Sequence, residues 1–310
     1  MALYVVTGAA GFIGSHLVDA LLASGHTVRG LDDFSTGRRE NVDPRCPVLQ
    51  GDVADPQTVH RAMQGADGCF HLAAQSSVTL TNEDWLGTHR TNQTGTITVL
   101  ETARTCGKIP VVYASSAAVY GDLGARTARE DTWPKPSAAY GADKLGSELH
   151  AAAAWTVHQV PTLGLRFFNV YGRRQNPGSR YSGVISIFIR RMAEGGSVTV
   201  HGDGQQVRDF IEVADVVAHL TAGMRQLEAR PGASIMNVCT GHGTSIIELI
   251  ATLSSAYGRK PRVLYAPARP GDIRHSVGDP SVAAAVLGFR ARVILSDGLP
   301  ALVESERAAA

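Results

Sequence analysis

The stretch "LYVVTGAAGFIG", residues 3–14, is a short apolar run that leads into Gly8, Gly11 and Gly14, spaced three residues apart. The next residues, 15–25, have the apolar period of a helix. A strand that turns sharply into a helix brings bare backbone to the positive end of that helix, where a pyrophosphate can approach. A glycine-rich turn alone would be weak evidence, but this one opens the chain's first strand–helix unit and predicts a dinucleotide site.

Working outward from this unit, strands and helices alternate through the first half of the chain. The expected strands are "TVRGLDD" (27–33), "PVLQGDV" (47–53), "DGCFHLAA" (67–74), "IPVVYASS" (109–116) and "TLGLRFFNV" (162–170). The expected helices are "PQTVHRAM" (56–63), a long one near 88–106 and another near 140–159. This alternation predicts an α/β fold with a Rossmann-like, doubly wound parallel sheet.

After Asn169 the alternation breaks, and "YGRRQNPGSRYSG" (171–183) is typical of a long loop. Shorter elements follow. We predict an NAD-binding domain over 1–168, with a returning segment near 212–240. The remaining residues, 169–310, mainly form a smaller C-terminal substrate-binding lobe.

Composition excludes several classes of function. The formal net charge of +1 gives no field for binding nucleic acid or an acidic membrane surface. No apolar run has transmembrane length, and the start "MALYVVTG" is strand-like rather than a signal peptide. The four cysteines have no zinc-type spacing, so no metal site is predicted. A cytoplasmic location is the expectation.

Asp32 stands at the end of the second strand, 18 positions after Gly14. A carboxylate there accepts hydrogen bonds from the adenosine ribose and repels a 2′-phosphate, which favours NAD over NADP. Arg38 and Arg39 follow closely and keep NADP as an alternative. Asp33 could lie at the cofactor, but it could equally be a solvated acid of the loop.

The next strands end on the same edge of the sheet, at Asp52 in "GDV" and at the small run Leu72, Ala73 and Ala74. Small residues would let a cofactor lie against the backbone, although core packing explains alanines equally well. The full predicted cofactor set is Gly8, Gly11, Phe12, Ile13, Gly14, Asp32, Asp33, Ser35, Thr36, Gly37, Asp52, Val53, Leu72, Ala73, Ala74, Asn92, Tyr140, Lys144 and Phe167.

Tyr140 and Lys144 in "YGADK" are four positions apart, so on a helix their side chains share one face. Ser116 ends the strand that precedes this helix. A tyrosine with a pKa near 10 is a poor base, but nearby cations favour its phenolate. Such a set could remove a hydroxyl proton while hydride leaves the same carbon. The plainer alternative is a half-buried tyrosine beside a solvated lysine.

These motifs together resemble the extended short-chain dehydrogenase/reductase family. The residues that carry the likeness are "TGAAGFIG", "GDV", "HLAA", "SSAAVYG", "YGADK", "RFFNVYG" and "VRDFIEVAD", in the family's order, and it runs from Tyr4 to about Asp279. Within the family the chain is most similar to NAD-dependent nucleotide-sugar 4-epimerases of the UDP-glucose 4-epimerase type.

The resemblance implies that Tyr140 takes the proton of the sugar's 4-hydroxyl, that Ser116 shares the hydrogen bond, and that Lys144 holds the nicotinamide ribose. It also implies a UDP-sugar substrate, a homodimer formed by the long helix pair, and roles near the cofactor for Asn92 and on the sugar diphosphate for Asn169. The substrate set it implies is Val78, Ser116, Tyr140, Asn169, Gly183, Val184, Val200, Arg208, Arg269 and Asp272.

Ala117 and Ala118 stand where relatives that dehydrate or decarboxylate sugars carry an acid. Alanine supplies neither an acid nor a base, which disfavours those reactions. Ser276 falls where epimerases restricted to glucose and galactose have a bulky aromatic residue, so we predict that N-acetylated sugars are accepted alongside UDP-glucose and UDP-galactose.

Three alternatives stay open at this point. UDP-glucuronate is a rival substrate, because Arg174 and Arg180 could meet a carboxylate. An NAD(P)H-dependent reductase of a 4-keto nucleotide sugar would use the same parts but release oxidised cofactor. A non-catalytic NAD-binding module would not need Ser116, Tyr140 and Lys144. Arg173 replaces the family's proline after "NVYG", a departure that bears on the shape of the sugar pocket.

Overall fold

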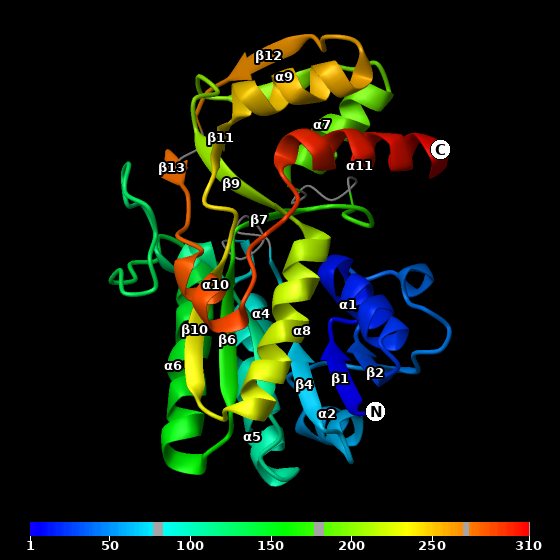
Figure 1. Ribbon diagram of the computed structural model, residues 1–310, viewed down its shortest axis with the longest axis vertical. Helices are drawn as coiled ribbons and strands as arrows, with labels where there is room; N and C mark the ends of the chain where they lie inside the picture. Colours follow the sequence, from blue (N-terminus) through cyan, green and yellow to red (C-terminus); the bar gives the residue numbers. More distant parts are fainter. Residues whose placement is uncertain (77–82, 177–182, 269–272, 310) are drawn as a thin grey trace.

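The larger lobe of the molecule is built around a seven-stranded parallel sheet (Figure 1). The strand order is β10-β6-β5-β4-β1-β2-β3. The computed structural model describes residues 1–76, 83–176, 183–268 and 273–309. The strands are β1 (Leu3–Thr7), β2 (Thr27–Asp32), β3 (Val48–Gln50), β4 (Gly68–His71), β5 (Val111–Ser116), β6 (Thr162–Phe167) and β10 (Ala233–Val238). The doubly wound α/β prediction is confirmed.

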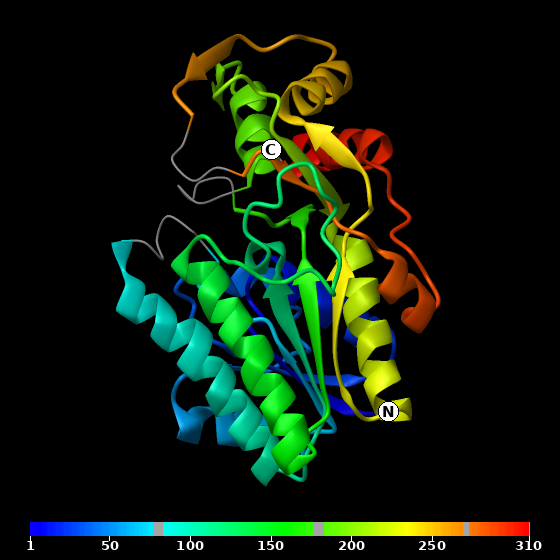
Figure 2. The same cartoon turned by 90° about the vertical axis from the view of Figure 1, so that its left-hand side faces the viewer.

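Helices cover both faces of this sheet (Figure 2). On one face α1 (Phe12–Ala23) packs beside α8 (Val213–Ala229), and on the other α5 (Gly95–Thr105) lies between α2 (Pro56–Met63) and α6 (Ala139–His158). Alternate residues of β1 enter the two cores: Tyr4 and Val6 join one cluster and Val5 the other. Burial on both faces explains why the strands are almost continuously apolar.

The helix expected near 88–106 begins earlier and is interrupted. It consists of α4 (Trp85–His89), a π-helical turn (Arg90–Thr94) and then α5. π-turns insert one residue into the helical ladder and often occur at functional sites. Thr91, which belongs to this turn, lines the cavity described below.

The smaller lobe has its own sheet and core. One sheet contains β7 (Asn169–Tyr171), β9 (Val207–Glu212), β11 (Gly243–Ser245) and β13 (His275–Ser276), and β8 (Val198–His201) pairs with β12 (Val263–Ala266). Around them lie α7 (Val184–Ala193), α9 (Ile246–Tyr257) and α11 (Leu295–Ala309), whose apolar faces form a separate cluster. The short helix α10 (Ser281–Leu287) packs on α8.

The chain passes between the two sheets at three places. Phe168 separates β6 from β7, β9 leads directly into α8, and β10 is followed by β11. Each passage lies at the carboxyl edge of the main sheet, so the smaller lobe faces the strand ends (Figure 1). Within the described ranges, no helix is both long and apolar enough to cross a membrane.

Candidate active site

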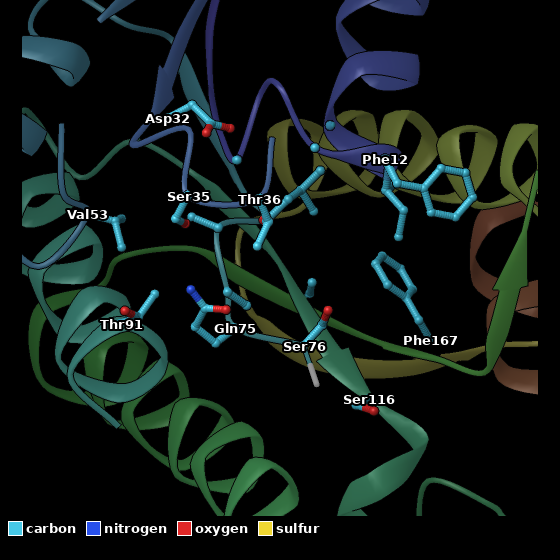
Figure 3. A pocket seen from close by; sticks show the side chains of 18 of the residues that line it. Phe12, Asp32, Ser35, Thr36, Val53, Gln75, Ser76, Thr91, Ser116 and Phe167 are labelled. Carbon is cyan, nitrogen blue, oxygen red and sulfur yellow. The ribbon is translucent and has the colours of Figure 1, made fainter. Parts of the chain in front are cut away.

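The carboxyl ends of the central strands border a cavity of about 290 Å³ (Figure 3). β1 lies between β2 and β4, so the chain leaves the sheet in opposite directions on either side of this point, where ligands of open α/β sheets bind. The sequence-predicted residues that line it are Gly8, Gly11, Phe12, Ile13, Gly14, Asp32, Asp33, Ser35, Thr36, Val53, Leu72, Ala73, Ala74, Ser116, Tyr140, Lys144 and Phe167.

The glycine turn fits a dinucleotide because it has no room for side chains. A Cβ on Gly14 would lie 2.0 Å from the Gly8 carbonyl oxygen, and one on Gly8 would lie 2.8 Å from the Ala73 nitrogen. Gly8 also has a φ of +70°, a backbone conformation that residues with a side chain rarely adopt. α1 starts at this turn without a side-chain cap, so its first-turn N–H groups and its dipole face the cavity.

Asp32 is fixed at the end of β2 by backbone donors. The Ala10 N–H donates to Oδ2 at 2.9 Å and the Phe34 N–H donates to Oδ1 at 2.8 Å. Burial raises the pKa of Asp32, and these two hydrogen bonds oppose that rise. Each carboxylate oxygen keeps further accepting capacity for a ribose diol.

The two arginines that left NADP open are engaged elsewhere. Arg38 lies 3.8 Å from the Glu40 carboxylate, and the Arg39 guanidinium stacks 4.3 Å from the centroid of the Phe34 ring. The buried Asp32 carboxylate therefore dominates the charge at this end of the cavity, which disfavours a 2′-phosphate.

Three members of the predicted cofactor set lie beside the cavity rather than on its lining. A Cβ on Gly37 would come within 2.9 Å of Asp32 Oδ1, so Gly37 borders the acid. Asp52 accepts from the Arg90 guanidinium at 2.6 Å. Asn92 exchanges two hydrogen bonds with the backbone of Gln75, at 2.8 and 3.1 Å. Asn92 thus holds the segment after β4, where Gln75 lines the cavity.

A buried histidine links the glycine turn to the next strand. Leu72 N–H and Ala73 N–H both donate to Thr7 Oγ1 at 3.2 Å, so the Thr7 proton is free to go to His71 Nδ1 at 2.8 Å. His71 Nε2 then donates to Thr96 at 3.1 Å. Burial, followed by the Lys144 charge, lowers the pKa of His71 to about 3, and the ring stays neutral at physiological pH.

Ser116, Tyr140 and Lys144 converge at one side of the cavity. Ser116 and Tyr140 both line the cavity, and their hydroxyl groups are near enough that Ser116 lowers the pKa of Tyr140. The Lys144 ammonium donates to the Ala114 carbonyl at 2.8 Å and lies 5.9 Å from the centroid of the Tyr140 ring. Tyr140 and Ser116 are half-buried, whereas Lys144 is buried. The arrangement offers a hydroxyl pair to a ligand and a cation behind it.

A second cavity, of about 340 Å³, lies in the smaller lobe. Four members of the predicted substrate set line it: Asn169, Val184, Val200 and Arg208. Gly183 immediately precedes α7, which carries Val184. The remaining predictions Val78, Arg269 and Asp272 lie outside the described residues, as does Arg180. Arg174, the other candidate for a uronate carboxylate, is paired with Asp19 of α1 at 2.8 Å.

Several lining residues were not predicted. Gln75 and Ser76 directly follow "HLAA". Both could have been predicted, because residues just after a strand lie on the same edge of the sheet as its end. The others are Leu31, Gly51, Thr91, Ala114, Ser115, Phe168 and Val170. Thr91 depends on the π-turn and had no sequence signal. In the part of the chain that the structure describes, no cluster of His, Cys, Asp or Glu could hold a metal ion.

The model of the NAD dependent epimerase/dehydratase family matches residues 4–239. The chain belongs to this family. It is 37% identical over 307 residues to a UDP-glucose 4-epimerase of Mycolicibacterium smegmatis, with 97% of each chain covered. Among solved structures, the UDP-glucose 4-epimerase of Thermotoga maritima with UDP-glucose superimposes with a TM-score of 0.94, at 32% identity and 99% coverage of both chains. The UDP-N-acetylglucosamine 4-epimerase of Methanobrevibacter ruminantium, in complex with UDP-N-acetylmuramic acid, gives 0.93 at 29% identity, covering 100% of this chain and 99% of the other.

Membership of the epimerase/dehydratase family makes the protein an NAD-dependent enzyme, in agreement with the cofactor expected from Asp32. The glycine turn and the buried Asp32 both line the cavity, where this cofactor would need backbone donors and a ribose partner.

Proposed function

We propose that the protein is a UDP-sugar 4-epimerase that inverts the 4-hydroxyl of UDP-glucose and UDP-galactose. One observation carries this proposal: Ser116 and Tyr140 both present a hydroxyl group to the same cavity, with the Lys144 ammonium behind them. Ala117 and Ala118 follow on the same turn, so no acid or base is available there for removing water.

In the proposed mechanism Tyr140 accepts the proton of the 4-hydroxyl and later returns it. Ser116 donates to the same sugar oxygen and keeps it aligned with the phenol. Bound NAD supplies the hydride acceptor and donor for carbon 4. Burial raises the pKa of Tyr140, and the hydrogen bond from Ser116 opposes this rise. A positive charge near the phenol is therefore needed to lower the pKa of Tyr140, and Lys144 is the protein's source of that charge.

Burial lowers the pKa of Lys144 to about 8, although the Asp143 carboxylate opposes the shift. The ammonium is present below that pH and is lost as the pH rises through it. We therefore expect kcat/KM to fall on the alkaline side with a midpoint near pH 8. A Lys144→Arg variant keeps its charge in that range. Its rate will be lower throughout, but its pH profile should show no alkaline fall with a midpoint near pH 8. A wild-type profile that is flat to pH 10 contradicts the prediction.

We also propose a division of labour along the chain. Residues 1–168, with a returning segment near 212–240, bind NAD, and residues 169–310 mainly bind the UDP-sugar. In support, β10 extends the main sheet and α8 packs on it, while Asn169 and Arg208 line the cavity of the smaller lobe. An arginine suits a diphosphate because its planar guanidinium bonds two oxygens at once.

The function is tested by supplying UDP-glucose, UDP-N-acetylglucosamine and UDP-glucuronate separately to purified protein and identifying the products by NMR. We expect UDP-galactose from UDP-glucose, with no net change in the absorbance of reduced cofactor. Stoichiometric oxidation of added NADH with a 4-keto sugar would favour the reductase alternative. Turnover of UDP-glucuronate alone would favour the uronate epimerase, against which the Arg174–Asp19 pair argues.

Ser276 leads to a prediction about N-acetylated sugars. Its small side chain borders a cavity of about 10 Å³, room for about one water, together with Ala117, Leu123 and Arg126. Arg126 donates to the Leu123 carbonyl at 3.2 Å and is exposed, so these two side chains can yield to an acetamido group. We expect UDP-N-acetylglucosamine to be epimerised. A Ser276→Tyr variant should lose that activity at least about tenfold and keep UDP-glucose turnover within a few-fold. Equal losses on both sugars would contradict it.

We infer that two copies associate through α5 and α6. Leu149 and Val157 of α6 are 65% and 69% exposed, and Ile97 of α5 is 39% exposed. Ile97 and Val157 also border a hollow of about 190 Å³ between these helices. Apolar side chains gathered on two neighbouring helices mark a surface for association.

The cytoplasmic location stays a prediction.

A Leu149→Glu variant tests this surface, because a carboxylate buried in an apolar interface costs several kcal/mol. We expect the wild type to sediment as a dimer and the variant as a monomer. The control is Tyr265→Glu on β12 in the smaller lobe, where the side chain is equally exposed at 65%. If both variants remain dimeric, the surface is not the interface.

A further inference from the structure

The contacts between the end of β5 and α6 follow one stripe of the helix. Tyr140, Lys144 and Glu148 are spaced by four residues and so lie on one face of α6. Lys144 donates to the Ala114 carbonyl, Glu148 accepts from the Ser115 hydroxyl, and Tyr140 lines the same cavity as Ser116. The third contact, at Glu148, has no part in the mechanism described above.

Glu148 is held by two other elements of the main sheet. The Ser115 hydroxyl donates to Oε1 at 2.5 Å, and Arg166 of β6 donates to both carboxylate oxygens at 2.8 Å. The side chains of Arg166 and Glu148 are only 4% and 3% exposed. A bidentate pair of this kind fixes both the distance and the orientation of its partners.

The guanidinium also contacts the other side of the strand end. Its carbon lies 4.7 Å from the centroid of the ring of Tyr120, which belongs to the turn after Ser116. The Tyr120 hydroxyl donates to Asn237 of β10 at 2.7 Å. Arg166 therefore connects the catalytic helix, through Glu148, to the turn that follows Ser116.

Stability alone does not account for this arrangement. Replacing a buried ion pair with apolar residues of similar volume is often neutral or stabilising, because desolvation offsets the attraction. What the pair does fix is the position and orientation of α6 relative to the strands β5 and β6. Without it, α6 could slide or rotate on β5, and the Ser116 and Tyr140 hydroxyls would separate. A displacement near 1 Å at such a site can lower turnover by about 10²-fold.

We propose that Glu148 and Arg166 are positioning residues that lock α6 on β5 and so keep Ser116 and Tyr140 aligned for proton transfer. This inference rests on the proposed function, but it assigns a role to residues that contact neither reacting atoms nor cofactor. Ser115 is the link from the strand to the same carboxylate.

The test compares Ser115→Ala, Glu148→Gln and the double variant Glu148→Met with Arg166→Met, assayed with UDP-glucose. For each we measure kcat, KM, bound NAD, the pH profile and the melting temperature. The control is Asp215→Asn, another buried carboxylate, which accepts the backbone N–H groups of residues 292 and 293 far from the stripe. Asp215→Asn should lower the melting temperature and leave kcat within about twofold.

We expect Ser115→Ala to lower kcat several-fold and Glu148→Gln to lower it about 10- to 100-fold, with KM and bound NAD close to wild type. The acid limb of the pH profile, where Tyr140 takes up its proton, should move to higher pH, because a displaced Ser116 no longer lowers the pKa of Tyr140. The double variant should regain melting temperature without regaining kcat. If kcat recovers with melting temperature, or if the acid limb stays in place in Ser115→Ala, the positioning role is refuted. A wild type without epimerase activity would instead refute the proposed function.

Discussion

A Tyr140→Phe variant should lose about 10³-fold in kcat while keeping its NAD and its affinity for UDP. Tyr140 is the proposed proton acceptor, and a positioned general base contributes about 10²- to 10⁴-fold to a rate. Phenylalanine keeps the ring and removes only the hydroxyl, which faces the same cavity as Ser116. The loss is measured with UDP-glucose at saturation, and bound cofactor is quantified after denaturation.

Tyr171→Phe is the matched control for this variant. Tyr171 of β7 is also buried, and its hydroxyl has no hydrogen-bond partner within the described ranges. Removing that hydroxyl should leave kcat within about twofold. Retention of full activity in Tyr140→Phe would remove the phenol from the mechanism, and so would an equal loss in both variants.

The Gly14→Ala variant should lose bound NAD and, with it, all detectable turnover in the absence of added cofactor. The new Cβ would lie 2.0 Å from the Gly8 carbonyl oxygen, and that neighbour is backbone, which cannot swing away. The strand and α1 must separate, which opens the turn and costs about 1–3 kcal/mol of stability. We expect the dissociation constant for NAD to rise at least about 100-fold, measured by titration of the apoprotein.

Gly232→Ala serves as the control for the glycine turn. Gly232 lies between α8 and β10, and a Cβ there would meet nothing within 4 Å. NAD binding and the melting temperature should match wild type. A Gly14→Ala protein that retains its cofactor would mean that the turn is more adaptable than its close contacts indicate.

The cofactor site was the most predictable part of the molecule, because its signals are local in sequence. Gly8, Gly11 and Gly14 meet within one turn, and Asp32 follows at the end of the next strand. Parallel strands bring their carboxyl ends to one edge, so each strand end could be assigned to the cavity from its place in the chain. The same rule brought Ser116 to that edge.

Contacts between distant residues were not predictable in this way. Arg166 is a charged residue within an apolar run, Glu148 lies on a helix of mixed polar and apolar residues, and nothing in their spacing pairs them. Asp52 was predicted at the cofactor from its motif, and its pairing with Arg90 of the π-turn, at 2.6 Å, had no signal in the sequence. The two arginines near Asp32 left the choice of cofactor open until their partners Glu40 and Phe34 were known.

The sequence by itself determined the order of strands and helices, the glycine turn, the acid that follows it, and the four-residue spacing of Tyr140 and Lys144. These follow from backbone sterics and helical period, which act over a few residues. Only the tertiary structure decided how α6 is held against β5, which arginines are already paired, and how the smaller lobe faces the strand ends. Those outcomes depend on burial and ion pairing between segments far apart in the chain, and no local pattern encodes them.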